Sequence, residues 1–167
     1  MGEEFKDFEM EGPSLTLEPD LGEFEKKEEP VKVEQPQPKE EAPALTPAEE
    51  ILKDAPDGIM LSNGPGDPKE CTTIIEEIRK LYESDVPIFA ICLGHQLMAL
   101  ATGADTHKLK YGHRGANHPV KDLMTGRVYI SSQNHGYVVD ETTLDPNVAK
   151  PAFENVNDKT NEGLEYV

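Results

Sequence analysis

The hydrophobic positions of the chain change their period several times between residues 44 and 167, and each change predicts a new element. Two short uninterrupted apolar runs, at residues 58–61 and 88–91, suit strands that are buried on both faces. Between them, residues 72–83 carry isoleucine, leucine and tyrosine at helical spacing, with charged residues on the opposite side. This pattern predicts an amphipathic helix.

Helices are also expected on either side of these segments. Thr46 is the expected N-cap of a short helix, with Pro47 at its first position and Glu49 three residues beyond the cap. Residues 92–100 follow the second strand without a loop, and Gly103 suits the C-terminal end of that helix. The order helix, strand, helix, strand, helix favours an α/β fold with a parallel sheet and right-handed crossovers.

The last third of the chain has the character of β structure. Residues 107–111 alternate between polar and apolar, and residues 127–133 are rich in strand-forming side chains. Residues 134–136, Asn-His-Gly, have the composition of a turn, so a hairpin is expected there. A final strand is expected at residues 164–167, whereas Pro151 argues against a strand where one would otherwise be placed.

The first 43 residues differ in composition from the rest of the chain. They contain 14 acidic and 5 basic residues and six of the fourteen prolines, with only scattered apolar residues. Such a segment cannot bury enough apolar surface to offset the loss of chain entropy on folding. We therefore predict a disordered acidic tail over residues 1–43, with an interaction tail as the alternative, and a partial domain over residues 44–167.

The charge balance and the cysteine count limit the functions open to the chain. Acidic residues outnumber basic ones by 33 to 16, for a net charge of −17, which argues against nucleic acid or an anionic membrane as a partner. No apolar run is long enough to span a bilayer, and the N-terminus lacks the pattern of a signal peptide. Two cysteines are too few for a disulfide framework, which favours a reduced, cytoplasmic protein.

Cys92 stands at the junction between the second predicted strand and the helix that follows it. There the side chain is exposed at the carboxyl edge of the sheet, and the helix N-terminus favours its thiolate. The N–H of Leu93 would point where an oxyanion forms, and an N–H from Gly64 or Gly66, after the first strand, could complete the hole. The alternative interpretations are a buried structural cysteine and an ordinary strand-to-helix turn.

Residues 90–96, Ala-Ile-Cys-Leu-Gly-His-Gln, closely resemble the nucleophile motif of class I glutamine amidotransferases. Three further stretches, at residues 61–68, 111–120 and 132–137, in this order resemble the small chain of carbamoyl-phosphate synthase. The resemblance runs from about Leu45 to the end of the chain. It implies a partial class I glutamine amidotransferase fold, which is flavodoxin-like, with a mostly parallel sheet and flanking helices.

The resemblance also implies a role for individual residues. Cys92 would attack the carboxamide carbon of L-glutamine, release ammonia and form a glutamyl thioester. Gly64 and Leu93 would supply the N–H groups of the oxyanion hole and contact the substrate. The other glutamine contacts would come from Gly66, Gln96, Asn134, Gly136 and Tyr137, with His135 as a possible assisting residue. A structural or surface role is expected for His107, His113 and His118.

The resemblance implies that ammonia passes to a large synthetase subunit, where ATP and Mg act. No cofactor and no metal are expected in this domain. The product could enter arginine or pyrimidine biosynthesis, and the sequence does not choose between them.

The family pattern is incomplete in this sequence. The family places a His-Pro-Glu motif, which supplies the general base and its carboxylate partner, beyond the stretch matched by residues 162–166, and the last histidine here is His135. We therefore expect a fragment of low or no activity, with residues 1–43 foreign to the family. The alternatives are a non-catalytic glutamine-binding or partner-binding remnant, the glutaminase of another class I synthase, or a non-functional gene fragment.

Overall fold

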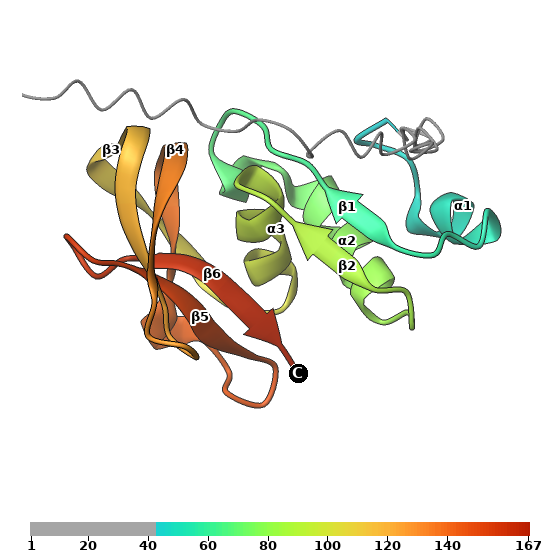
Figure 1. Cartoon of the computed structure of the whole chain (residues 1–167). Coiled ribbons are helices and arrows are strands. Elements are labelled where there is room, and N and C mark those ends of the chain that lie inside the picture. Colours follow the sequence, from blue (N-terminus) through green and yellow to red (C-terminus); the bar gives the residue numbers. More distant parts are fainter. Residues whose placement is uncertain (1–42) are drawn as a thin grey trace, which may run out of the picture. The chain divides into compact units, whose positions relative to one another are not determined.

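The computed structural model describes residues 43–167, so the tail predicted over residues 1–43 lies, apart from Pro43, outside the described part of the chain. The described residues form three α-helices, two short 3-10 helices and six strands (Figure 1). In chain order these are α1 (Ala48–Lys53), β1 (Ile59–Leu61), η1 (Pro68–Glu70), α2 (Thr72–Tyr82), β2 (Ile88–Ala90), α3 (Leu93–Ala101), β3 (Asp105–Asp122), β4 (Val128–Asp140), η2 (Glu141–Thr143), β5 (Ala149–Asn155) and β6 (Asn161–Tyr166).

The first half of the described chain is the α/β part that the sequence predicts. β1 and β2 pair in parallel, with Met60 opposite Phe89, and α2 connects them. The expectation that both faces of these strands are buried is wrong within residues 43–167, because Met60 is 52% exposed and Phe89 is 65% exposed. Helices cover one face of this two-stranded sheet, and the side chains that point to the other face are uncovered.

Within residues 43–167, helix α3 contributes to two separate apolar clusters. Leu97 and Met98 pack with Ile78 of α2 and with partly buried side chains of β1 and β2. Ala99 packs on another side against Val139 of β4, in a second buried cluster. The helix that begins behind Cys92 is therefore fixed by both the α/β part and the antiparallel sheet.

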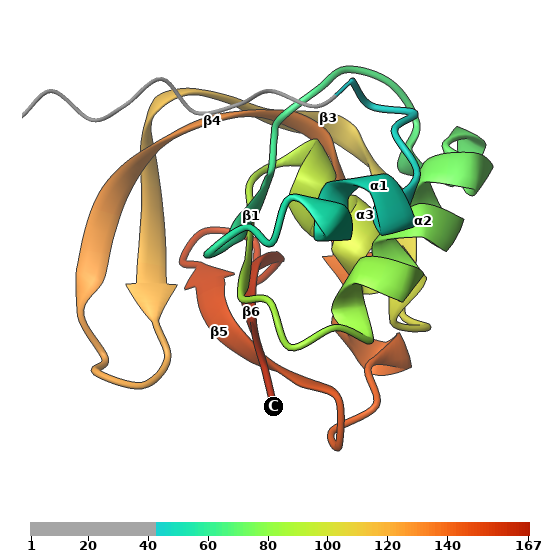
Figure 2. The same ribbon diagram turned by 90° about the vertical axis from the view of Figure 1, so that its right-hand side faces the viewer.

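The second half of the described chain is a four-stranded antiparallel sheet with the strand order β4-β3-β5-β6. β3 and β4 form one long curved hairpin (Figure 2). The turn predicted at residues 134–136 is wrong, because these residues continue β4, and His135 pairs with His113. The turn lies instead after Asp122, whose carboxylate accepts the N–H of Met124 at 2.8 Å and whose carbonyl accepts the N–H of Gly126 at 2.9 Å.

Pro151 does not prevent a strand, contrary to expectation. It lies within β5 opposite Leu164 of β6, next to a register shift before Phe153. Proline is tolerated at such irregular positions, where the ladder does not require its missing N–H. Most strand pairs in residues 43–167 are antiparallel, and the parallel pairing is confined to β1 and β2.

The start of α1 also differs from the expectation. The structure places Pro47, not Thr46, at the N-cap, and no side chain of α1 itself caps the helix. The N–H of Ala48 instead donates to the Glu77 carboxylate on α2, at 2.7 Å. A neighbouring helix satisfies the exposed N–H group, which a local sequence pattern cannot reveal.

A close approach between α3 and β1 generates the first prediction. A Cβ atom added at Gly94 would overlap the carbonyl oxygen of Leu61, and would lie 2.7 Å from its carbonyl carbon. We expect Gly94→Ala to lower the free energy of unfolding by about 1–3 kcal/mol, because backbone cannot move aside as a flexible side chain can. Urea unfolding followed by circular dichroism measures this change.

Gly58→Ala is the matched control, since a Cβ there would make only an ordinary contact of 3.5 Å with the carbonyl oxygen of Pro87. We expect its stability to stay within about 0.5 kcal/mol of the original chain. Equal stability of the two variants would contradict the role assigned to Gly94.

Candidate active site

Cys92 has a backbone conformation that few residues other than glycine adopt. It stands between β2 and α3 with φ of 52° and ψ of −110°, as the N-cap residue of the helix. The turn is held by Gly94, whose N–H donates to the carbonyls of Ser62 at 3.1 Å and Ile91 at 2.9 Å. Such strain persists only where the surrounding structure enforces it, and it is concentrated at functional sites.

The predicted oxyanion-hole residues lie close together. A Cβ atom added at Gly64 would lie 2.7 Å from Cδ2 of Leu93, so the loop after β1 lies directly against the start of α3. Within residues 43–167, no carbonyl or side chain accepts the N–H of Gly64 or of Leu93. Gly66, in the same loop, has φ of +107°, a conformation that favours glycine. The role of these N–H groups in catalysis remains a prediction.

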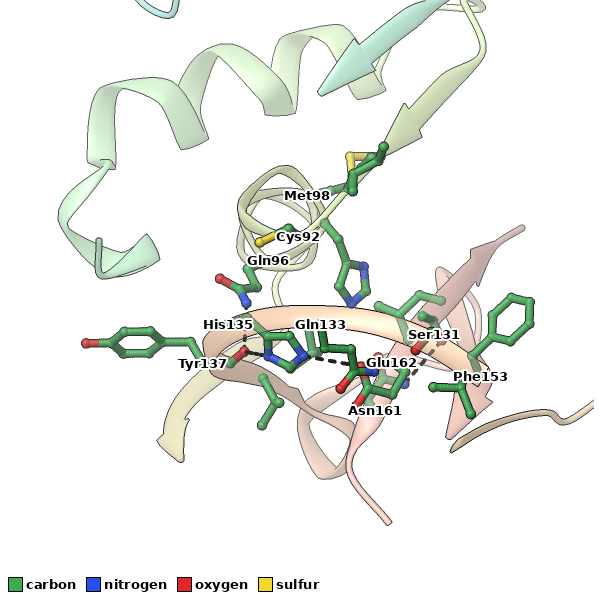
Figure 3. A pocket seen from close by; sticks show the side chains of 18 of the residues that line it. Cys92, Gln96, Met98, Ser131, Gln133, His135, Tyr137, Phe153, Asn161 and Glu162 are labelled. Atoms are coloured by element: carbon green, nitrogen blue, oxygen red, sulfur yellow. Dashed lines mark hydrogen bonds and ion pairs between the residues drawn. The ribbon is translucent and has the colours of Figure 1, made fainter. Parts of the chain in front are cut away.

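A pocket of about 500 Å³ lies between β2 and α3 on one side and the antiparallel sheet on the other. Figure 3 shows Cys92 and Gln96 on one side of it, with His135 and Glu162 on the other. Of the nine site residues predicted from the sequence, five line this pocket: Cys92, Gln96, Asn134, His135 and Tyr137. The other four, Gly64, Gly66, Leu93 and Gly136, are not part of its wall.

The carbonyl of Tyr137 joins the helix behind Cys92 to strand β4. The buried side chain of Gln96 donates from Nε2 to this carbonyl at 2.7 Å, and Nδ1 of His135 donates to it at 3.0 Å. The phenol of Tyr137 faces the loop after β1, where loss of hydration and then the Asp67 carboxylate raise the pKa of Tyr137. Strand β4 is therefore held, at Tyr137, near both α3 and the loop after β1.

The sequence analysis did not identify a cluster of ionisable side chains that contacts this strand. Nε2 of His135 lies 3.4 Å from Oε2 of Glu162, and Nδ1 of His113 lies 3.0 Å from Oε1 of the same carboxylate. Nδ1 of His113 is not aligned for a hydrogen bond with any acceptor in the described residues. Its other nitrogen, Nε2, lies 2.7 Å from Oδ2 of Asp158. A structural or surface role was expected for His113. The structure shows that His113 is buried and lies between two carboxylates.

The two carboxylates of the cluster come from the turn between β5 and β6, which holds Asp158, and from the start of β6, which holds Glu162. The amide of Asn155, almost completely buried, donates to Glu162 at 3.0 Å, and its side-chain oxygen accepts the N–H of Asn157. Asp158 accepts the N–H and hydroxyl of Thr160, which fixes its orientation towards His113. The run of asparagine, aspartate and threonine over residues 155–161 was the available sequence signal for such a turn.

His113, His135 and Glu162 also have potential metal-ligating atoms within 4.8 Å of one another, although the sequence predicted no metal site. The hydrogen bonds of His135 and the ion pairs of the cluster engage most of these atoms within the protein.

Contacts within the cluster shift the pKa of His135 and of Glu162. Burial lowers the pKa of His135, but the hydrogen bond and charge of Glu162 outweigh this effect and raise the pKa overall. Burial raises the pKa of Glu162, but the hydrogen bonds from His135 and Asn155 outweigh it and lower the pKa. His95, on α3, is different, because burial lowers its pKa and so favours the neutral imidazole.

Comparison with known proteins identifies the class to which this site belongs. The family described as "Glutamine amidotransferase class-I" matches residues 31–166. The chain therefore belongs to the class I glutamine amidotransferases. The match begins before residue 44, inside the segment predicted to be a tail.

The chain is also similar to small chains of carbamoyl phosphate synthase. The protein of that name from Rubrivivax gelatinosus is 57% identical over 122 residues, which cover 73% of this chain and 32% of the relative. The one from Yersinia pseudotuberculosis is 60% identical over 106 residues, covering 64% of this chain and 27% of the relative. This chain spans about a third of the length of these relatives.

Solved structures confirm the fold class. A glutamine amidotransferase from Thermotoga maritima matches with a TM-score of 0.55 and 19% identity, covering 71% of this chain and 64% of that one. A glutamine amidotransferase from Methylobacillus flagellatus matches with a TM-score of 0.53 and 18% identity, covering 66% and 47%. Among the described residues, no helix has the length and apolar character needed to cross a membrane.

The ionisation of the pair formed by His135 and Glu162 generates the second prediction. The folded-state pKa of His135 lies above 6.5, so its contribution to stability is full below about pH 6.5 and is lost as the pH rises through that pKa. The pKa of Glu162 lies below 4.5, so its contribution is present above about pH 4.5 and is lost as the pH falls. The pair therefore stabilises the fold most between these limits.

We expect Glu162→Gln to lower the free energy of unfolding by about 1–3 kcal/mol at about pH 5.5, and by less at about pH 8. Urea unfolding at both pH values measures the difference. Glu165→Gln is the control on the same strand, because Glu165 is exposed and pairs with the exposed Lys150. A loss at Glu162 that is the same at both pH values would contradict this account.

Proposed function

We propose that residues 44–167 form a glutaminase domain with Cys92 as its nucleophile, acting as the glutamine-hydrolysing component of carbamoyl-phosphate synthase. The observation that carries the proposal is the strained backbone at Cys92, which presents this residue at the start of α3 and at the wall of a pocket. Identity of 55–60% with carbamoyl phosphate synthase small chains supports the choice of this enzyme among class I amidotransferases.

The proposed reaction begins when the Cys92 thiolate attacks the carboxamide carbon of L-glutamine. The C–N bond breaks, the nitrogen leaves as ammonia after accepting a proton, and a glutamyl thioester forms. Water then hydrolyses the thioester to glutamate and restores the thiol. The N–H groups of Leu93 and Gly64 stabilise the negative oxygen that forms in each step, which their unsatisfied state and close approach support.

The rest of the substrate is proposed to bind along β4 and the loop after β1. Gln96 and Gly66 would hold the amino-acid end of glutamine, with Asn134, Gly136 and Tyr137 contacting it from the strand. The proximity of Tyr137 to both Gln96 and the loop residue Asp67 supports this arrangement. His135 would assist by holding the carbonyl of Tyr137 in place.

The ammonia is proposed to pass to the large subunit of carbamoyl-phosphate synthase, on which ATP and Mg would act. This partner follows from the relatives that are named as its small chain. The reaction would take place in the cytoplasm and supply arginine or pyrimidine biosynthesis. Nucleic acid and membranes are not expected as partners, given the net charge of −17.

Turnover by this chain alone is proposed to be slow. Among residues 43–167, no side chain forms a hydrogen bond with Sγ of Cys92, although a general base must lie within hydrogen-bonding reach of the group it activates. The sequence contains no His-Pro-Glu motif. Loss of one member of such a catalytic triad typically costs orders of magnitude in rate. Alkylation of the Cys92 thiolate by a reactive substrate analogue, in contrast, needs only the pocket and the thiolate.

Labelling with a diazoketone analogue of glutamine tests this proposal. We expect one covalent adduct per chain, located at Cys92 by peptide mass spectrometry, with a rate that saturates and is reduced by added L-glutamine. Cys92→Ser should abolish the adduct. Cys71→Ser is the matched control and should label normally, because Cys71 packs against the core formed around Ile78. An absence of labelling at Cys92, or no protection by glutamine, would refute the proposed function.

Ammonia release from L-glutamine, measured with the same preparations, tests the proposed slow turnover. We expect a rate at least about a thousandfold below that of enzymes with a complete triad. Rapid ammonia release that is lost in Cys92→Ser would contradict this part of the proposal.

A further inference from the structure

A continuous series of polar contacts connects the turn between β5 and β6 with α3, the helix that follows Cys92. It begins at the Asp158 carboxylate, passes through His113 and Glu162, and reaches His135. From Nδ1 of His135 it continues to the carbonyl of Tyr137, which also accepts from Gln96 on α3. Four sequence-distant elements, β3, β4, β6 and α3, are thereby connected, and Figure 3 shows the part that involves Glu162, His135, Tyr137 and Gln96.

Burial of His113 and Glu162, which lie in the middle of this series of contacts, is unfavourable in free energy. The side chains of His113 and Glu162 are only 9% and 8% exposed, and taking charged groups out of water is unfavourable unless each is paired. A well-packed apolar cluster would stabilise a fold at least as effectively. The proposed reaction, as described above, gives neither Glu162 nor His113 a task. Because neither stability nor the reaction explains the burial of these two side chains, their role is to hold neighbouring residues in position.

The β3–β4 ladder pairs Asn134, His135 and Tyr137 with β3 but leaves Gly136, within the segment that the cluster supports, without a partner. The β3–β4 ladder pairs Lys108 with Tyr137 and resumes only at His113 opposite His135. Residues 109–112 of β3 thus bulge opposite the single residue Gly136, and the regular backbone hydrogen bonds are interrupted. Side-chain contacts must supply the constraint that the ladder lacks at this point.

The contacts of His135 are suited to constrain residues 134–137. Nδ1 donates to the Tyr137 carbonyl, and Nε2 faces Oε2 of Glu162. An imidazole that donates from both nitrogens is protonated, and a carboxylate at Nε2 favours that form. The Tyr137 carbonyl then has both lone pairs engaged, one by β4's own histidine and one by Gln96 of α3.

We propose that Glu162 and His113 are positioning residues for the glutamine subsite: they hold His135, and through it residues 134–137, at a fixed place relative to Cys92. Neither residue touches the reacting atoms. This proposal rests on the proposed function, because that function assigns substrate contacts to residues of β4. It extends that function by identifying what keeps an irregular strand segment in a binding-competent geometry.

The labelling reaction separates positioning from chemistry. For the full chain and the diazoketone analogue, we expect Glu162→Gln to raise the half-saturating concentration about tenfold while the limiting rate stays within about twofold. Alkylation of Cys92 by iodoacetamide, which does not require the glutamine subsite, should proceed at the original rate. Glu165→Gln, the exposed control on β6, should change none of the three quantities.

His113→Asn provides a second route to the same result, because it removes a contact of Glu162 without removing the carboxylate. We expect it to raise the half-saturating concentration by a smaller factor than Glu162→Gln. An unchanged half-saturating concentration in both variants would overturn the proposal. So would a loss of cooperative unfolding in both, or an equal fall in the iodoacetamide rate, because the cluster would then support the whole fold.

The original chain distinguishes failure of this inference from failure of the proposed function. If its labelling does not saturate, or glutamine does not compete, the glutaminase function itself is wrong, and the positioning role fails with it. If the original chain saturates normally and both variants match it, only the positioning role is refuted.

Discussion

The contact between Gly94 and the backbone of Leu61 determines the geometry on which the other features depend. Because no Cβ intervenes, α3 begins directly against β1, and the chain passes from β2 into the helix through the strained conformation at Cys92. That approach also sets the distance between the loop after β1 and the start of α3. The pocket and its two opposed walls follow from the placement of this one helix.

The local part of this arrangement could be predicted from the sequence. Short apolar runs and a helical stripe were sufficient for β1, α2, β2 and α3, and the position of Cys92 between strand and helix follows from them. The predicted turn at Asn134 and Gly136 was wrong, because their turn-forming tendency is overridden by pairing with β3 and by the better turn chemistry after Asp122. Propensity is a local quantity, whereas pairing depends on residues far away along the chain.

The charged cluster could not be predicted for the same reason. Glu162 and His113 are 49 positions apart and meet only because β6 and β3 belong to one sheet with β5 between them. Each residue considered alone, a histidine in an alternating segment or a glutamate near a chain end, has an ordinary exposed interpretation. Buried charge becomes visible only when the topology is known, and here it lies beside an interruption of the β3–β4 ladder.

The uncovered face of β1 and β2 has a consequence for how copies of this chain behave towards one another. Met60 and Phe89 present apolar surface to solvent, and β2 pairs with β1 alone among the described strands. Such a face attracts other apolar surfaces, while the net charge of −17 repels like molecules over roughly 10 Å in 0.1 M salt. Colloidal behaviour is therefore a balance of short-range attraction and long-range repulsion. High salt, or a pH near the isoelectric point of about 4.6, shifts that balance towards association.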